Sequence, residues 1–352
     1  MKRIGLIIIG LLAAVLAADA CTSAIVSGTM TDTGKPLLWK NRDTDFTDNF
    51  VAKVAPSAPG ELAYVALFNA GDSLLAEAWI GVNEAGFAIM NTASYNLAPD
   101  TATYKDREGA IMAAALKKCR TVDEFERFLD GCQKPMGVQA NFGVIDAGGA
   151  GAYFETDDNS FKRYDLADEP SGVILRTNYS YSGNPDEGFG YIRENTAKHL
   201  LKPYLDGKKA LTPYIFTDVL SRSFYHSLIG RDMLDTDDEW MVDQDFIPRR
   251  STSASVAIGF DDAGSPVMWT VLGYPPCSYA RKVTLDSVPE DMQPEPATWR
   301  SRFCDEVNER KAEVFPIKRG SGSHYINIPR LRLYNDSLRG KSREAAYSYM
   351  LF

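Results

Sequence analysis

The pattern of hydrophobic and polar residues along the chain predicts several strands that pair as hairpins. Apolar and alternating segments at 21–28 and 35–43 flank the turn-rich stretch TMTDTG, which is typical of a β-hairpin. Similar strand pairs are expected within 61–94, 141–156 and 251–273, where NEAG, a Gly-Gly pair and DDAG supply the turns.

Helices are predicted between these strands. Residues 109–119 have the composition and length of a helix, and 121–132 begins with Thr121 as N-cap and Glu124 three residues later, a capping box. Further helices are expected at 189–205, 212–228 and 296–315, and a further strand at 171–180.

The predicted strands and helices occur in separate blocks along the chain. This order favours a layered α+β domain over a doubly wound sheet, in which strands and helices alternate one by one. The sequence contains neither GxGxxG nor GxxxxGK[ST], the motifs that bind dinucleotides and nucleotide phosphates. We therefore expect residues 21–352 to form a single α+β domain.

Residues 1–20 are predicted to be a secretory signal peptide. Two positive residues precede the apolar run Ile4–Leu16, which is shorter than the roughly 20 residues that a membrane span needs. Ala18 and Ala20 form a small-x-small cleavage site. Cleavage after Ala20 would make Cys21 the first residue of an exported protein, periplasmic or extracellular.

A lipid-anchored Cys21 is the alternative interpretation of this N-terminal region. A lipidation site usually has Leu three residues before the cysteine and a small uncharged residue two before it. Here these positions hold Ala18 and Asp19, so we favour the signal peptide.

The charge and hydropathy of the chain exclude two classes of partner. The formal net charge is −9, and loss of residues 1–20 makes it −10. Binding to nucleic acid needs clustered positive charge, so we expect no nucleic-acid partner. No stretch after residue 20 is long and apolar enough to span a membrane. The sequence leaves open whether the chain forms a homo-oligomer.

The five cysteines bear on both disulfides and chemistry. Export would permit disulfides, for instance Cys119–Cys132 and Cys277–Cys304, but free buried thiols are equally compatible with the sequence. If the other four cysteines form these two pairs, Cys21 is the one left without a disulfide partner. No CxxC motif or Cys/His cluster is present, so we expect neither a metal nor another cofactor.

A cysteine at the start of a mature chain has its own general base. The free thiol has a pKa of about 8.5. The α-amine has a pKa of about 7.7 to 8.0, so a useful fraction is uncharged near neutral pH and can take the proton of the thiol. Ala20 in peptide linkage would remove this base. A Cys–His pair stays open as the alternative, because partners can meet in space from His199, His226 or His324.

The segment CTSAIVSG…GKPLLWKNRDTDF resembles the start of N-terminal-nucleophile hydrolases. The closest group is the choloylglycine hydrolase and penicillin V acylase clan, with the acyl-CoA:6-aminopenicillanate acyltransferase (peptidase C45-like) family. The resemblance implies a four-layer αββα sandwich of antiparallel sheets. It also implies that Asp45 of RDTDF contacts the α-amine and thiol of Cys21, with Arg42 beside the nucleophile. On its own, this Arg/Asp pair could equally be a surface ion pair.

Three looser matches extend the implied site. GVNEAGFAIMN resembles a segment whose last residue, here Asn91, helps to form the oxyanion hole, and VILRTNYS makes Asn178 a second polar contact. PRRSTSASV resembles a late element of the family in which an arginine precedes a strand. This makes Arg250 a candidate site residue, with Arg249 an equal rival. Both asparagines could instead be ordinary turn residues.

The function implied is cleavage of a linear amide bond in a small N-acyl compound, through an acyl-enzyme on Cys21. Conjugated bile acids, penicillin-like amides and N-acyl amino acids or amines are candidate substrates. An acyltransferase of the same fold and a non-catalytic lipoprotein anchored through Cys21 are the alternatives. The local signature of papain-like proteases is absent.

Overall fold

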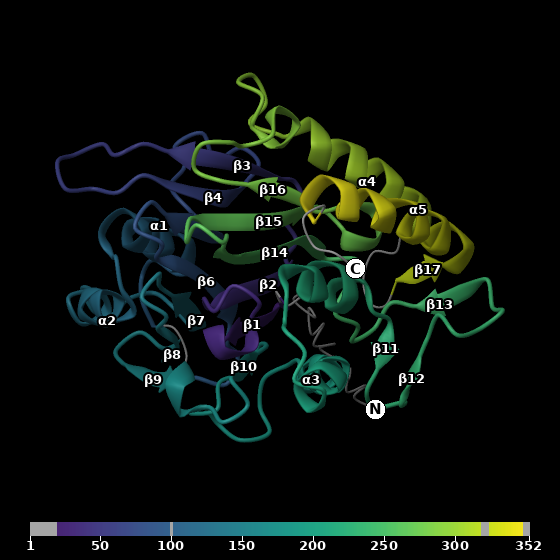
Figure 1. The fold of residues 1–352 in the computed structure, drawn as a ribbon, viewed down its shortest axis with the longest axis horizontal. Helices are drawn as coiled ribbons and strands as arrows, with labels where there is room; N and C mark the ends of the chain where they lie inside the picture. The colour runs from purple at the N-terminus through teal and green to yellow at the C-terminus, as the bar shows by residue number, and fades with distance from the viewer. Residues whose placement is uncertain (1–19, 99–100, 318–323, 348–352) are drawn as a thin grey trace, which may run out of the picture.

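The computed structural model describes residues 20–98, 101–317 and 324–347, and most of its strands form two antiparallel sheets (Figure 1). Residues 1–19 of the predicted signal peptide lie outside the described residues. The six-stranded sheet has the order β10–β1–β2–β14–β15–β16, with bounds Val173–Arg176, Thr22–Val26, Leu37–Asp43, Thr252–Phe260, Pro266–Leu272 and Arg281–Val283. The seven-stranded sheet runs consecutively from β3 to β9, with bounds Asn49–Val54, Tyr64–Asn69, Ile80–Asn83, Ala88–Ala93, Ala140–Ile145, Gly151–Thr156 and Phe161–Asp165.

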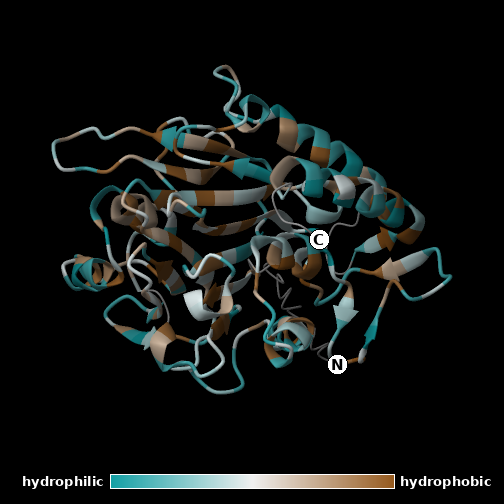
Figure 2. Ribbon diagram, viewed as in Figure 1, coloured by the Kyte–Doolittle hydropathy of each residue, from teal (hydrophilic) through white to brown (hydrophobic). Residues whose placement is uncertain are grey.

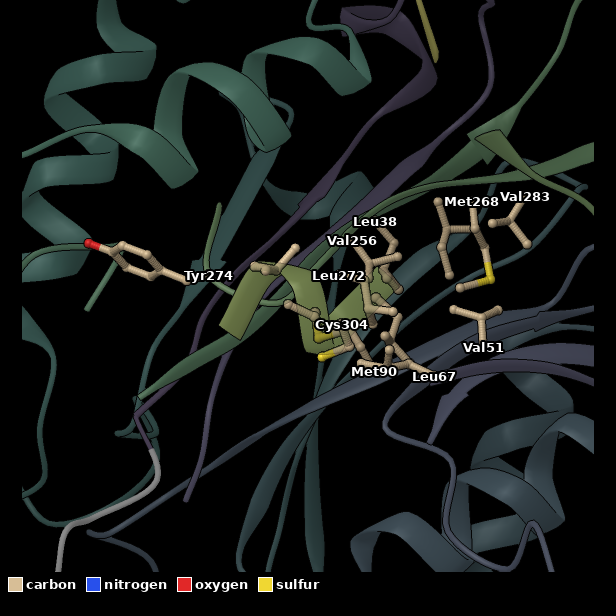
Figure 3. Close-up of a cluster of buried hydrophobic side chains, with 14 of the residues drawn as sticks. Leu38, Val51, Leu67, Met90, Val256, Met268, Leu272, Tyr274, Val283 and Cys304 are labelled. Carbon is tan, nitrogen blue, oxygen red and sulfur yellow. The ribbon is translucent and has the colours of Figure 1, made fainter. Parts of the chain in front are cut away.

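The main hydrophobic core lies between the two sheets. Leu38 of β2 and Val256 of β14 belong to the same buried cluster as Val51, Leu67 and Met90 of the seven-stranded sheet (Figure 3). Because successive side chains of a strand point to opposite faces, the residues on either side of Leu38 belong instead to the cluster on the outer face. Burying both faces explains why β1, β2 and β14 have few exposed positions.

Helices cover the outer faces of both sheets. Helices α1 (Glu108–Lys118) and α2 (Val122–Asp130) pack on the seven-stranded sheet, where the ring of Phe125 lies 5.8 Å from that of Phe142. Helix α3 (Tyr191–Asp206) packs on the six-stranded sheet. The layers are thus helix, sheet, sheet and helix, which confirms the predicted αββα sandwich.

Helices α4 (Arg302–Val314) and α5 (Ile328–Ala346) lie side by side at one end of the sandwich (Figure 1). Phe303 and Val307 of α4 join the core between the sheets. The outer surfaces of α4 and α5, which face away from the core, are mainly hydrophilic (Figure 2). Helix α5 was not predicted, and neither was strand β3. The helix predicted at 212–228 was too long, because helical structure ends at Arg222.

Two small antiparallel pairs complete the described structure, β11 (Tyr225–His226) with β12 (Arg231–Asp232) and β13 (Trp240–Val242) with β17 (Tyr325–Asn327). All five cysteines are free thiols, so the disulfides that the sequence left open are not formed here. In the described ranges, no helix combines the length and the hydropathy required to cross a bilayer.

Candidate active site

Cys21 lies directly before β1, an interior strand of the six-stranded sheet. Thr22 pairs with Asn41 of β2, and Ser23 pairs with Arg176 of β10, so Cys21 is flanked by the ends of two strands. The cysteine is buried, and its Sγ lies 3.8 Å from the backbone oxygen of Asp43. Ala20, whose bond to Cys21 the signal cleavage would break, is buried as well.

Arg193, in the first turn of α3, holds the backbone of Cys21 in place. Its Nη1 donates to the backbone oxygen of Cys21 and, over 2.9 Å, to Oγ1 of Thr22. Its Nη2 donates over 2.8 Å to Oδ1 of Asn178. Burial and, second to it, the nearby Arg249 together lower the pKa of Arg193 to about 10. One guanidinium thus connects three of the polar groups around Cys21.

Sequence reasoning missed Arg193 because it lies within a segment that was predicted simply as a helix. A signal was nevertheless present three residues earlier. Gly190 has φ of +99°, and a Cβ there would lie 2.6 Å from Nη2 of Arg193 and from Cβ of Thr177. Only glycine fits such a position without strain, and this glycine lets the loop approach the arginine closely.

The buried carboxylate nearest to Cys21 in the sequence motif RDTDF belongs to Asp43, whereas the resemblance implied Asp45. Asp45 follows the end of β2 and is exposed. Asp43 is buried, and its Oδ1 accepts from Oγ1 of Thr252 over 2.6 Å and from Nδ2 of Asn41 over 3.0 Å. Burial raises the pKa of Asp43 to about 7, although Arg249 and Arg193 act to lower it.

This pKa predicts how stability depends on pH. A folded-state pKa above the unfolded one means that the folded chain holds a proton that the unfolded chain has already lost. The unfolding free energy should therefore fall as pH rises towards 7. Between pH 5 and 7 this amounts to about 2 kcal/mol. Urea unfolding of the chain that retains Ala20 should show this loss for wild type relative to Asp43→Asn, and equal pH slopes would contradict it.

Of the two rival arginines, Arg249 reaches the site and Arg250 does not. Nε of Arg249 lies 3.3 Å from Oδ2 of Asp43, and its Nη2 lies 3.3 Å from Oδ1 of Asp245. Arg250 is exposed, and only its backbone nitrogen binds a neighbouring carboxylate, that of Asp243. The choice of Arg250 is thus corrected to Arg249.

Matched substitutions of these two arginines should have unequal effects. Arg249→Met leaves the buried carboxylate of Asp43 without its ion-pair partner, so we expect a loss of about 2 kcal/mol or more in unfolding free energy at pH 8. Arg250→Met alters a surface position and should change stability by less than about 0.5 kcal/mol. Urea unfolding of both variants measures the difference, and equal losses would show that Arg249 has no special role.

Asn178 is linked to Cys21 through Arg193, which binds both residues. Its Oδ1 accepts from Arg193, and its Nδ2 donates over 2.9 Å to the backbone oxygen of Ala93 at the end of β6. The asparagine therefore links the six-stranded sheet to the seven-stranded sheet at the level of the nucleophile.

Arg42 and Asn91 line a cavity of about 690 Å³, together with Ala93, Trp79 and other residues. Nη1 of Arg42 donates to Oδ1 of Asn49 over 2.7 Å, and its guanidinium lies 4.7 Å from the centre of the Trp79 ring. Ala93 also lines this cavity and accepts a hydrogen bond from Asn178, which in turn is connected to Cys21 by Arg193.

The carboxamide of Asn91 is oriented by Lys40. Nζ of Lys40 donates over 2.8 Å to Oδ1 of Asn91. The hydrogen bond from Lys40 is the one that the Asn91 side chain makes within the described residues, so its Nδ2 donates none there, and Asn91 lines the cavity. This leaves an N–H donor available at the cavity wall, the feature that an oxyanion hole requires.

Two of the three histidines have aromatic neighbours. The ring of His199 stacks on Tyr225 with 4.0 Å between centroids, and His226 meets Phe246 edge-on at 5.9 Å. Among the described residues, no group of three or more His, Cys, Asp or Glu side chains is placed to hold a metal ion.

Comparison with known proteins gives matches to solved structures. No model of a known family and no curated protein matches the sequence. A mutant of the conjugated bile acid hydrolase from Clostridium perfringens matches with a TM-score of 0.47 and 11% identity, over 76% of this chain and 92% of that one. The Caenorhabditis elegans ortholog of N-acylethanolamine-hydrolyzing acid amidase matches with a TM-score of 0.45 and 15% identity, over 68% of this chain and 92% of that one. Penicillin V acylase from Agrobacterium tumefaciens matches with a TM-score of 0.40 and 13% identity, over 76% of this chain and 87% of that one.

Proposed function

We propose that the chain cleaved after Ala20 is an exported cysteine amidase that hydrolyses linear amide bonds of small N-acyl compounds. The observation that carries this proposal is the placement of Cys21. It is buried at the start of an interior strand, and Arg193 holds its backbone. Through Arg193 and Asn178 it is linked to Ala93, in the wall of a cavity that also holds the oriented Asn91.

The reaction would proceed in two halves on the sulfur of Cys21. The α-amine takes the thiol proton, and Sγ attacks the amide carbon to form a C–S bond and an oxyanion. Collapse breaks the C–N bond, and the leaving amine takes the proton back from the α-ammonium. Water then attacks the thioester and gives its proton to the α-amine, and the C–S bond breaks to release the acid and restore the thiol.

The surrounding residues have separate roles in this scheme. Nδ2 of Asn91 donates to the oxyanion, an interaction that can contribute about 3 kcal/mol to the barrier. Arg193 is a positioning residue, because it holds the backbone of Cys21 and the side chain of Asn178. Asp43 and Arg249 form the buried ion pair behind them.

A panel of N-acyl substrates tests this function. Protein whose N-terminus is shown by intact mass to be Cys21 should release the amine from at least one of four classes: conjugated bile acids, penicillin-like amides, N-acyl amino acids and N-acyl amines. Hydroxylamine added in competition distinguishes transfer from hydrolysis, because an acyltransferase would form the hydroxamate in preference to the acid. A diacylglyceryl group on Cys21, or no release from any class, would refute the proposal.

A further inference from the structure

A second cavity, of about 660 Å³, opens where the two sheets end side by side. It is lined by β9, the last strand of the seven-stranded sheet, by β10, the edge strand of the other sheet, and by α3 (Figure 1). It shares no lining residue with the cavity beside Arg42. Its volume is in the range of small-molecule sites.

One wall of this cavity is apolar. Val173 and Leu175 of β10 and Leu201 and Leu205 of α3 contribute aliphatic side chains to it. They are continuous with the hydrophobic cluster between α3 and the six-stranded sheet. An aliphatic or ring-shaped hydrocarbon would lose contact with water along this wall, which is the main favourable contribution to binding of apolar groups.

A buried guanidinium lies at the polar end of the same cavity. Arg176 is only 2% exposed, and it donates from Nε to Oε1 of Glu155 over 2.8 Å and from Nη1 to the oxygen of Leu175 over 2.9 Å. Nη2 donates no hydrogen bond within the described part of the chain, and Arg176 lines the cavity. The guanidinium lies 3.9 Å from the centre of the Tyr181 ring, which fixes its plane.

The carboxylate of Glu155 does not compete for a ligand. Its Oε1 also accepts from the backbone nitrogen of Tyr181, and its Oε2 accepts from the nitrogen and hydroxyl of Ser182. Four donors thus occupy the two oxygens, about as many as a carboxylate can accept. The donor edge of Arg176 is therefore the part of this buried pair that a ligand can reach.

The charged residues at the rim largely neutralise one another. Arg163 pairs with Asp165 at 2.7 Å, and Lys202 pairs with Asp206 at 2.7 Å. Lys198 pairs with Glu194. The remaining charged lining residues are Lys162, Asp168 and Glu169. The rim therefore favours neither sign strongly, and the preference for a head group depends on Arg176.

We infer that this cavity binds an amphipathic carboxylate, with its anionic head on Nη2 of Arg176 and its apolar body along β10 and α3. The inference does not depend on the proposed amidase activity. If that activity is correct, the acids released by the enzyme belong to the same chemical class.

Calorimetric titration of the full chain with decanoate tests this inference, with 1-decanol and decylamine as probes of the same tail. A hydrogen bond to a charged group should make decanoate bind about tenfold or more tightly than either probe. Arg176→Lys keeps a positive charge beside Glu155 but removes the free N–H edge, and it should abolish the preference for decanoate while leaving decanol binding unchanged.

A cavity-filling variant keeps the test independent of the buried arginine. Leu205→Trp should weaken decanoate at least tenfold, whereas Leu228→Trp, at a surface leucine that is 77% exposed, should not. If Arg176→Lys does not fold, the head-group comparison in wild type and the two tryptophan variants decide the matter. Equal binding of decanoate and decanol, or unchanged binding in Leu205→Trp, would overturn the inference.

Discussion

Replacing Cys21 by alanine is expected to abolish acyl release while leaving the fold intact. The substitution removes the proposed nucleophile, and loss of such a group costs roughly 10⁶-fold in rate. It removes only one sulfur atom from a buried position, so the structural change is small. Amine release from the best N-acyl substrate measures the rate, and circular dichroism with urea unfolding checks the fold. Turnover within tenfold of wild type would exclude Cys21 as the nucleophile.

Cys21→Ser gives a graded version of the same test. A hydroxyl at this position keeps the shape of the side chain, but it is far harder to deprotonate than a thiol, so the α-amine becomes a poorly matched base. We expect a loss of orders of magnitude that is smaller than for alanine. Identical rates for the alanine and serine variants would mean that neither retains a usable nucleophile.

The second large effect is expected from keeping Ala20 attached to an unchanged Cys21. The thiol is then present, but its proposed base is a neutral amide nitrogen. General-base assistance is worth about 10²–10⁴-fold, so the uncut chain should be slower by at least this factor. A cleavage-site variant that blocks removal of the signal peptide supplies the uncut form, and its mass confirms that Ala20 is retained.

Labelling with iodoacetamide at neutral pH gives an independent measurement for this comparison. Cys21 should react more slowly in the uncut chain, because a smaller fraction is thiolate. Burial of Cys21 could also slow the reagent, so Cys132, which is partly exposed, serves as an internal reference. Equal turnover and equal labelling of the two forms would show that the α-amine is not the base, and His199, His226 and His324 would then be tested one by one.

Much of the fold could be predicted from the sequence because the core strands have strong local signals. The hairpin that begins at Cys21 and the pair within 251–273 combine apolar runs with turn residues, and both occur in the six-stranded sheet. Strand β3 was missed because it is short, and polar residues, Asn49 and the exposed Lys53, leave only a brief apolar run between them. Helix α5 was missed because its buried positions are widely spaced among charged residues.

The site could be predicted only to within a few residues of the correct positions. Asp43 and Asp45 both occur in RDTDF, and the motif alone cannot show that β2 ends between them. The same holds for Arg249 and Arg250, which directly precede β14. In both cases the choice depends on which side chain the neighbouring strands bury and supply with partners, and this is a property of the folded chain.

Arg193 was beyond the reach of sequence reasoning for a different reason. It lies on α3, far along the chain from Cys21, and its role depends on the helix packing against the end of β1. A long-range contact of this kind leaves no local pattern apart from Gly190. Cys21, Arg42, Asn91 and Asn178, by contrast, could be proposed from the sequence because each belongs to a short motif at a strand or its end.

The most direct test of the account is to identify the residue that carries the acyl group. Cut protein would be mixed with its best substrate, quenched in acid within the first turnover, and examined by intact and peptide mass spectrometry. We expect an added mass equal to the acyl group, located on the N-terminal peptide at Cys21 and absent from Cys21→Ala. Turnover accompanied by an acyl adduct on any other residue, or on none, would contradict Cys21 as the nucleophile.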